Sequence, residues 1–281
     1  MHLALYHLPI MTSEQFFFIH LSDPQLGLMA EKGRVDPSEG FAAEADLFQQ
    51  AVAEANRLKP DFVVVTGDIG QNSMAPLEIA EVKRVASGLD RSIPIYWAPG
   101  NCDTTFNGHT ASPELLETYR AEFGPDYHSF NHKGVGFIVL SSAVIYDPSE
   151  VPGEWESQLE FVKAALSASV ERGDSKRIIF MHHPLFTGGP DDADSPKHIP
   201  TVRRRPLISL CREYDVTAVF AGHLHRNNYA WDGDMPMVAT SAVGMQMGDD
   251  ESGFRVVKVL KDTIEHDYYA FGSGPENVSL A

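Results

Sequence analysis

The stretch that decides the fold is FVVVTGDIG, residues 62–70, in which an apolar run leads into Thr66, Gly67 and Asp68. Such a run is typical of a buried strand, and Gly67 allows the backbone to turn sharply where the strand ends. A carboxylate buried there without a partner would be costly. Cations held at the strand end would remove that cost, and Asp68 can offer one oxygen to each of two ions.

Four other apolar runs end in the same way, at side chains of a type that binds metal ions. They end at Asp23, at Asn101, at His182 and at the pair His223 and His225. If the chain is extended there, the two imidazoles of the pair point the same way. Each short motif alone is more often structural. Five strand ends with such residues are improbable as independent structural features, so the pattern predicts a two-metal hydrolase.

Strand and helix patterns alternate from about residue 14 onward, which indicates an α/β layered architecture. Sites in such folds gather beyond the carboxyl ends of the strands. Over the last 45 or so residues, consecutive strand-like runs predict a meander of hairpins. We expect one domain over residues 16–281, preceded by a loosely ordered leader over residues 1–15. Helical spacing is found at 48–58, 76–88, 112–122, 155–170 and 204–214.

Composition restricts the functional class. The 281 residues carry a net charge of -17, which argues against nucleic-acid binding because that needs a basic surface. The two cysteines, Cys102 and Cys211, indicate no disulfide framework and fit a reducing compartment. No apolar stretch is long enough to cross a bilayer, so we expect a soluble, cytoplasmic protein with no membrane partner. The sequence does not specify the oligomeric state.

Taken together, five motifs resemble the signature of the calcineurin-like metallophosphoesterases, in the same order along the chain. The resemblance spans about residues 16–271. More narrowly, DPQLGL at 23–28, AGHLHRN at 221–227 and SAVGMQMG at 241–248 resemble a subfamily whose members include a serine/threonine phosphatase. The five motifs are DPQ at 23–25, GD at 67–68, GNCD at 100–103, HHP at 182–184 and GHLH at 222–225.

This resemblance implies an α/β fold of four layers, a two-sheet β-sandwich flanked by helices (αββα). It also implies two divalent or trivalent metal ions, with Mn, Fe or Zn expected. Asp68 would bridge the ions, and water activated between them would attack a phosphate monoester. The first ion would be held by Asp23, Gln25 and His225, and the second by Asn101, His182 and His223.

Two positions depart from the family pattern. Gln25 stands where the wider family has a histidine ligand, and its amide oxygen would bind a metal more weakly. Cys102 stands where the family has a histidine that binds phosphate or protonates the leaving group, oriented by the acid that follows, here Asp103. General-acid catalysis contributes roughly 10²–10⁴-fold. We therefore expect slow turnover on poor leaving groups unless another histidine substitutes: His109, His128 or His183.

Phosphate binding needs further positive contacts. Arg203, Arg204 and Arg205 form a basic cluster in a predicted loop before a helix, and Arg203 is a candidate phosphate contact. Arg226, beside His225, is an alternative. We expect a phosphorylated substrate, either a phosphoprotein or a small phosphate ester. Two alternatives stay open: a phosphodiesterase acting on cyclic nucleotides or nucleotide diesters, and a weakly active metal-binding scaffold.

Overall fold

The computed structural model describes residues 14–280, which form two β-sheets packed face to face. The five-stranded sheet has the order β11-β10-β1-β2-β3 and the six-stranded sheet the order β4-β5-β6-β7-β9-β8. The leader predicted over residues 1–15 lies outside the described residues except for Glu14 and Gln15. The strands are β1 Phe16–Leu21, β2 Val63–Thr66, β3 Ile95–Ala98, β4 His128–His132, β5 Val135–Val139, β6 Lys176–Phe180, β7 Ala218–Ala221, β8 Asn228–Asp232, β9 Met235–Ala239, β10 Gly253–Val259 and β11 Ile264–Ala270.

Alternate residues of each central strand face opposite layers. In the first sheet, Phe18 and Val64 point to the second sheet, where the Phe18 ring lies 5.5 Å from that of Phe180. Their neighbours Ile19 and Val65 point outward to helices. Because side chains alternate along a strand, a strand covered on both faces reads as one continuous apolar run. The runs in the sequence are apolar for this reason, and the predicted sandwich is confirmed.

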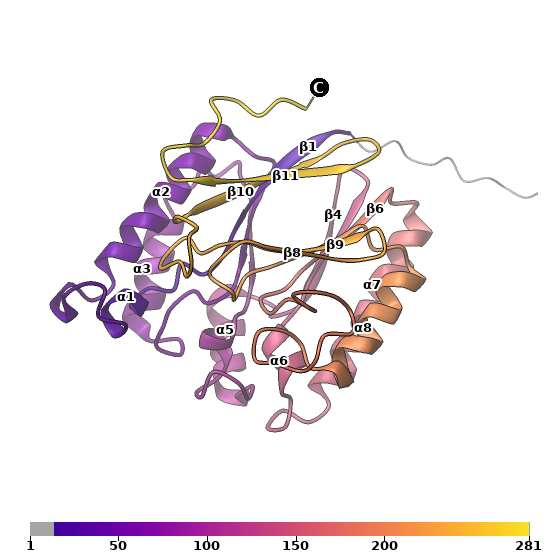
Figure 1. The fold of residues 1–281 in the computed structure, drawn as a ribbon, viewed down its shortest axis with the longest axis horizontal. Helices are drawn as coiled ribbons and strands as arrows, with labels where there is room; N and C mark the ends of the chain where they lie inside the picture. Colours follow the sequence, from indigo (N-terminus) through magenta and orange to yellow (C-terminus); the bar gives the residue numbers. More distant parts are fainter. Residues whose placement is uncertain (1–13, 281) are drawn as a thin grey trace, which may run out of the picture.

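The helices form the two outer layers (Figure 1). Helices α2 and α3 cover the first sheet, while α7 and α8 cover the second. The predicted helical segments are all present. None of the helices in residues 14–280 is long and apolar enough to cross a membrane. The helices are α1 Leu28–Glu31, the 3₁₀ helix η1 Pro37–Glu39, α2 Ala42–Leu58, α3 Pro76–Ala86, α4 Asn101–Thr104, α5 Pro113–Phe123, α6 Ser142–Tyr146, α7 Glu154–Arg172 and α8 Thr201–Glu213.

The meander predicted for the C-terminal region is wrong. Strand β9 belongs to the six-stranded sheet, between β7 and β8, whereas β10 returns to pair antiparallel with β1 in the other sheet. Strands β10 and β11 do form a hairpin, but β9 pairs antiparallel with β8, which precedes it, and not with β10. Met237 and Val238 of β9 are buried on opposite faces, one against helices and one between the sheets, so β9 is a central strand.

The parallel strands set the position of the site. Strands β1, β2 and β3 run parallel to one another in the first sheet, as do β5, β6, β7 and β9 in the second. Their carboxyl ends meet at one rim of the sandwich. The sequence pattern placed the candidate ligands at that rim.

Candidate metal centre

The rim brings the predicted side chains together from both sheets. Asp23 and Asp68 follow β1 and β2, and Asn101 opens α4 just after β3. From the second sheet, His182 follows β6, and His223 and His225 follow β7. Two groups have ligand atoms within 4.8 Å of one another: Asp68, His182 and His223, and Asp23, Asp68 and His225.

Asp68 belongs to both groups, which is the arrangement that a bridging carboxylate requires. Its Oδ2 lies 3.4 Å from His182 Nε2. The same nitrogen is 3.1 Å from Asn101 Oδ1 and 3.2 Å from His223 Nδ1. In the other group, His225 Nε2 lies 3.3 Å from Asp23 Oδ1. Several lone pairs therefore converge on each of two neighbouring points.

Each of the three histidines donates one ring N–H to a backbone carbonyl. His182 Nδ1 donates to Thr66 (2.7 Å), His223 Nε2 to Pro196 (3.0 Å) and His225 Nδ1 to Met245 (2.5 Å). A carbonyl can only accept, so these contacts assign the tautomer. When the ring is neutral, its other nitrogen faces the cluster with a free lone pair, as in metal-binding histidines.

The backbone at the rim is unusually strained. Of the ten non-glycine residues with positive φ among residues 14–280, five belong to the predicted ligand set: Asp23, Gln25, Asp68, His223 and His225. A non-glycine residue in this region costs of order 1–3 kcal/mol and persists only where its surroundings enforce it. This strain is concentrated where the side chains converge.

Two glycines allow the strand ends to approach this closely. A Cβ at Gly100 would overlap the Asp68 carboxylate and backbone, and a Cβ at Gly222 would overlap the Ser22 hydroxyl. Both glycines directly precede a predicted ligand, Asn101 and His223. The Gly-Asn and Gly-His pairs therefore reflect packing between neighbouring strand ends as well as turn geometry.

The electrostatics of the site call for added positive charge. Burial alone would raise the pKa of Asp68, but the His182 and His223 side chains beside it lower that pKa below its usual range. Burial alone would lower the pKa of His182, and Asp68 and Asp23 instead raise it. Two buried acceptors, Asp23 Oδ1 and Gln25 Oε1, have no hydrogen-bond partner among the described residues. A cation at each point fits these observations.

Cys102 and Asp103 lie beside the groups. Cys102 Sγ accepts from Gln25 Nε2 (3.1 Å), while its backbone N–H donates to Asp68 Oδ1 (2.8 Å). Cys102 belongs to neither of the two groups. Asp103 is buried and accepts backbone N–H groups of Gly100 (2.7 Å) and Ile69 (2.8 Å). Asp103 therefore holds the turn that carries Asn101, and the residue beside it is a thiol and not the imidazole that the family pattern pairs with this acid.

The three histidines considered as substitutes for Cys102 lie outside both groups. His183 is 2% exposed, with Nδ1 against the Ser142 hydroxyl (2.9 Å) and its ring 4.3 Å from that of His223. The Tyr146 ring lies between His109 and His183, and both imidazoles stack on it. His128 packs beside Tyr96 and Phe130 in the strand region. His183 is thus the one nearest the cluster.

The arginines are placed differently from the prediction. The prediction placed Arg203, Arg204 and Arg205 in a loop, but all three lie inside α8, which begins at Thr201. Arg204 is fully buried within the first turn of this helix. Arg203 Nη1 donates to the Tyr146 carbonyl (2.9 Å), beside the ring that stacks on His183. Arg226 is exposed and follows His225 directly.

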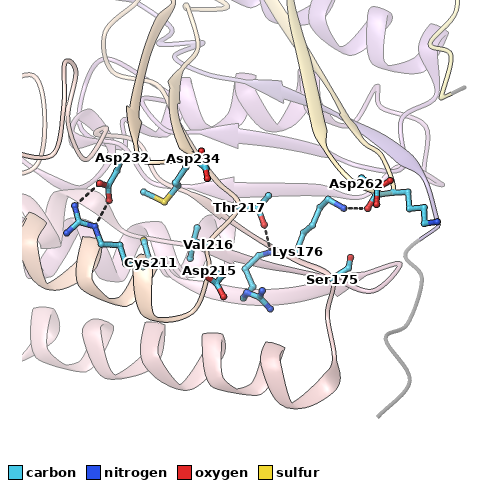
Figure 2. A pocket seen from close by; sticks show the side chains of 13 residues that line it. Ser175, Lys176, Cys211, Asp215, Val216, Thr217, Asp232, Asp234 and Asp262 are labelled. Atoms are coloured by element: carbon cyan, nitrogen blue, oxygen red, sulfur yellow. Dashed lines mark hydrogen bonds and ion pairs between the residues drawn. The ribbon is translucent and has the colours of Figure 1, made fainter. Parts of the chain in front are cut away.

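A cavity of about 640 Å³ lies elsewhere (Figure 2). Its lining includes Lys176 at the start of β6 and Thr217 just before β7, the opposite strand ends from those that carry His182 and His223. Arg212 and Asp232, which also line it, form an ion pair. The cavity contains none of the predicted site residues, so it is separate from the rim.

Sequence reasoning missed several contacts at the rim. The carbonyls of Thr66, Pro196 and Met245 that orient the histidines carry no sequence signal, because any residue supplies a carbonyl. Gln71, whose Oε1 accepts from Gln25 Nε2 (2.9 Å), was also missed. The one sequence feature that points to Gln71 is its position, three residues after Asp68 in the segment that follows the strand.

Comparisons with known proteins agree with the geometry. A family model described as calcineurin-like phosphoesterase matches residues 18–227. The serine/threonine-protein phosphatase CPPED1 of Danio rerio is 35% identical over 267 residues, covering 92% of this chain and 85% of that protein. A probable cyclic nucleotide phosphodiesterase of Rhodococcus erythropolis is 28% identical over 273 residues, 92% of this chain and 84% of its own.

Among solved structures, a dimetal phosphatase from Danio rerio has a similar fold. The TM-score is 0.67 at 15% sequence identity, and the match covers 92% of this chain and 97% of that one. At this identity the likeness concerns the fold: two sheets between helices.

Proposed function

Because this chain belongs to the calcineurin-like phosphoesterase family and is a phosphatase, we propose that it removes phosphate from serine and threonine side chains of proteins. The observation that carries the proposal is Asp68, which belongs to two ligand groups at once. Relatives named serine/threonine-protein phosphatases, 35% and 34% identical to this chain, support the substrate class. The proposed ligands are Asp23, Gln25, Asp68 and His225 for the first ion and Asp68, Asn101, His182 and His223 for the second.

Metal ions bound there lower the pKa of a water molecule and offset charge on the phosphoryl oxygens. The residues of the chain supply the geometry. Asp68 Oδ1 is held by the Cys102 N–H, which leaves Oδ2 toward both groups. Asn101 contributes a neutral oxygen and limits the negative charge of the site. Carboxylate, amide and imidazole ligands together suit Mn, Fe or Zn.

Arg203 and Arg226 are the proposed phosphate contacts. Arg203 is anchored to the Tyr146 carbonyl near His183, and Arg226 adjoins the ligand His225. A guanidinium can bind two phosphate oxygens at once. We also propose a reducing compartment such as the cytoplasm, because both cysteines of the chain are free thiols.

A second candidate activity is phosphodiester hydrolysis. The relative from Rhodococcus erythropolis, named a probable cyclic nucleotide phosphodiesterase, supports it at 28% identity. The same pair of ions would serve either reaction, since both proceed by attack of water on phosphorus.

The test compares para-nitrophenyl phosphate with bis-para-nitrophenyl phosphate in the presence of Mn²⁺. We expect faster hydrolysis of the monoester. In Asp68→Asn we expect kcat/KM to fall by more than roughly 100-fold. Loss of a residue that only supports a metal ligand lowers activity by about 10–100-fold, and loss of the ligand itself should lower it further. Metal content, measured by elemental analysis, should fall in parallel. Asp90→Asn, at an exposed turn before β3, is the matched control. Full activity of Asp68→Asn would reject the proposed centre, and faster diester cleavage would favour the second candidate.

A further inference from the structure

The side chains of Gln25 and Gln71 are brought together by the backbone. Gln25 N donates to the Asp68 carbonyl (2.9 Å), and Gln71 N donates to the Leu26 carbonyl (3.0 Å). Between them, Leu26 and Gly70 form an isolated parallel bridge. The segments after β1 and β2 therefore continue side by side beyond the strands, with the two glutamines adjacent.

A chain of hydrogen bonds fixes both amides. Gln71 Nε2 donates to Glu31, and Gln71 Oε1 accepts from Gln25 Nε2 (2.9 Å). A carboxylate such as that of Glu31 only accepts, so it selects the nitrogen of the Gln71 amide. The oxygen of that amide must then face Gln25 and select its nitrogen in turn. Glu31 thus sets the orientation of Gln25 through Gln71.

The consequence is an oxygen with no donor. Gln25 Nε2 also contacts Asp68 Oδ2 (3.3 Å), so the amide borders the shared carboxylate. Gln25 Oε1 is buried and has no hydrogen-bond partner among the residues described, and the same is true of Asp23 Oδ1. Buried acceptors are normally satisfied. Two such acceptors in one turn, beside the group of Asp23, Asp68 and His225, favour a cation at this end of the site.

We propose that Gln71 is a positioning residue that holds the Gln25 amide with its oxygen toward the first ion, and that Glu31 holds Gln71. This inference rests on the metal centre proposed above.

Gln71 Oε1 is one of three acceptors around Gln25 Nε2, with Asp68 Oδ2 (3.3 Å) and Cys102 Sγ (3.1 Å). Without it the Gln25 amide is held less firmly, and a turn that brings its NH₂ group to the ion site places a donor where a cation needs an acceptor. The affinity for the first ion then falls. The affinity for the second ion, held through Asn101, His182 and His223, does not change.

The test measures Mn²⁺ binding to the metal-depleted full chain by isothermal titration calorimetry, with no substrate present. The wild type should bind two ions. Gln71→Met, similar in size but without an acceptor, should lower the affinity of one ion by about 10–100-fold and leave the other unchanged. Gln49→Met, on the exposed face of α2, is the matched control and should bind as the wild type does.

A charge-neutral exchange gives the sharper result. Glu31→Gln combined with Gln71→Glu keeps an acceptor beside Gln25 and a donor at position 31, so it should restore the lost affinity. Glu31→Gln alone, at an exposed position, should show an intermediate loss.

Three outcomes would overturn the proposal. They are unchanged binding in Gln71→Met, equal weakening of both ions, and an exchange variant as weak as Gln71→Met. If Gln71→Met is unstable to heat without metal, Glu31→Gln and the exchange variant decide. A wild type that binds fewer than two ions would instead count against the proposed metal centre itself, so the two failures are distinguishable.

Discussion

At the residue scale, position 102 carries a thiol where the family pattern has a histidine. The Cys102 thiol lies against Gln25 Nε2 and beside Asp68. Burial, with Asp68 and Asp103 nearby, raises the pKa of this thiol, so it is a poor proton donor and carries no positive charge toward phosphate. The chain therefore combines the proposed metal ligands with a thiol in place of an imidazole at this position.

Replacing Cys102 with histidine should restore acid catalysis. For Cys102→His we expect kcat on an alkyl phosphate to rise by roughly 10²-fold, while kcat on para-nitrophenyl phosphate changes little because its leaving group needs no proton. The measurement is steady-state hydrolysis of both esters at matched Mn²⁺ occupancy. No gain on the alkyl ester would show that the missing imidazole does not limit the rate.

The residues that could be predicted from sequence are those that interrupt an apolar run. Asp68 and His182 were predicted because a buried strand that ends in a charged group is rare. Gln71 could not be predicted, because its role depends on Glu31 and Gln25, which lie 40 and 46 residues away in sequence. Arg204 was misplaced for a similar reason: its partners lie in the preceding loop.

At the element scale, α8 and the loop before it support the rim as one unit. Arg204 is fully buried and donates to His198 Nδ1 (2.9 Å) and the Ile199 carbonyl (3.1 Å), and also to the Asp192 carbonyl. The same loop supplies the Pro196 carbonyl that accepts from His223. Arg204, which the sequence placed with Arg203 and Arg205 in a basic cluster, is therefore a structural anchor of the loop that orients His223.

Removing this anchor should loosen the loop and affect the site indirectly. For Arg204→Met we expect the free energy of unfolding to fall by about 2–4 kcal/mol, because several buried acceptors lose a charged donor. Limited proteolysis should cut first within residues 184–200. Arg205→Met, at an exposed position on the same helix, is the matched control. Equal stability of the two variants would contradict the anchoring role.

Helices were predicted correctly where apolar residues recur at helical spacing. Strand partners were predicted correctly only where the two strands are neighbours in the sequence. Helices α2 and α7 match their apolar spacing. Strands β4 and β8 gave no clear signal because β4 is polar at every position except Phe130, and in β8 three residues between Asn228 and Asp232 are too few to show a pattern. The partner of β9 could not be read from its sequence, since a buried apolar strand fits either sheet and the choice depends on β7.

At the scale of the whole molecule, the proposed centre joins the two sheets. The first sheet contributes Asp23, Asp68 and Asn101, and the second contributes the three histidines. Each group in which Asp68 takes part also includes a histidine from the other sheet. Ions bound there would therefore link the two halves of the sandwich seen in Figure 1, whose interior is packed with aromatic and aliphatic side chains.

A polar network also joins the sheets away from the rim. Arg255 of β10 donates to Thr240 Oγ1 (2.8 Å), just after β9, to Tyr229 of β8 (3.1 Å) and to His266 Nδ1 of β11 (3.0 Å). Thr240 in turn contacts buried His20 of β1 (2.9 Å). His266 can accept from Arg255 only while its Nδ1 is unprotonated. The network therefore requires a neutral imidazole between two sheets.

This requirement makes the stability of the whole molecule depend on pH. Burial, and then the adjacent Arg255, lower the pKa of His266 to about 4, against a small opposing effect of Asp267. The unfolded chain takes up this proton near pH 6.5 and the folded chain only near pH 4. The contribution of neutral His266 to the free energy of unfolding is therefore fully present above pH 6.5 and is lost as pH falls from 6.5 to 4.

In His266→Gln, which keeps an acceptor for Arg255, the loss of unfolding free energy between pH 7 and pH 4.5 should shrink by about 1–2 kcal/mol, allowing for partial exposure. Urea unfolding at both pH values measures this. A loss as large as that of the wild type would show that another group, such as buried His20, carries the pH dependence.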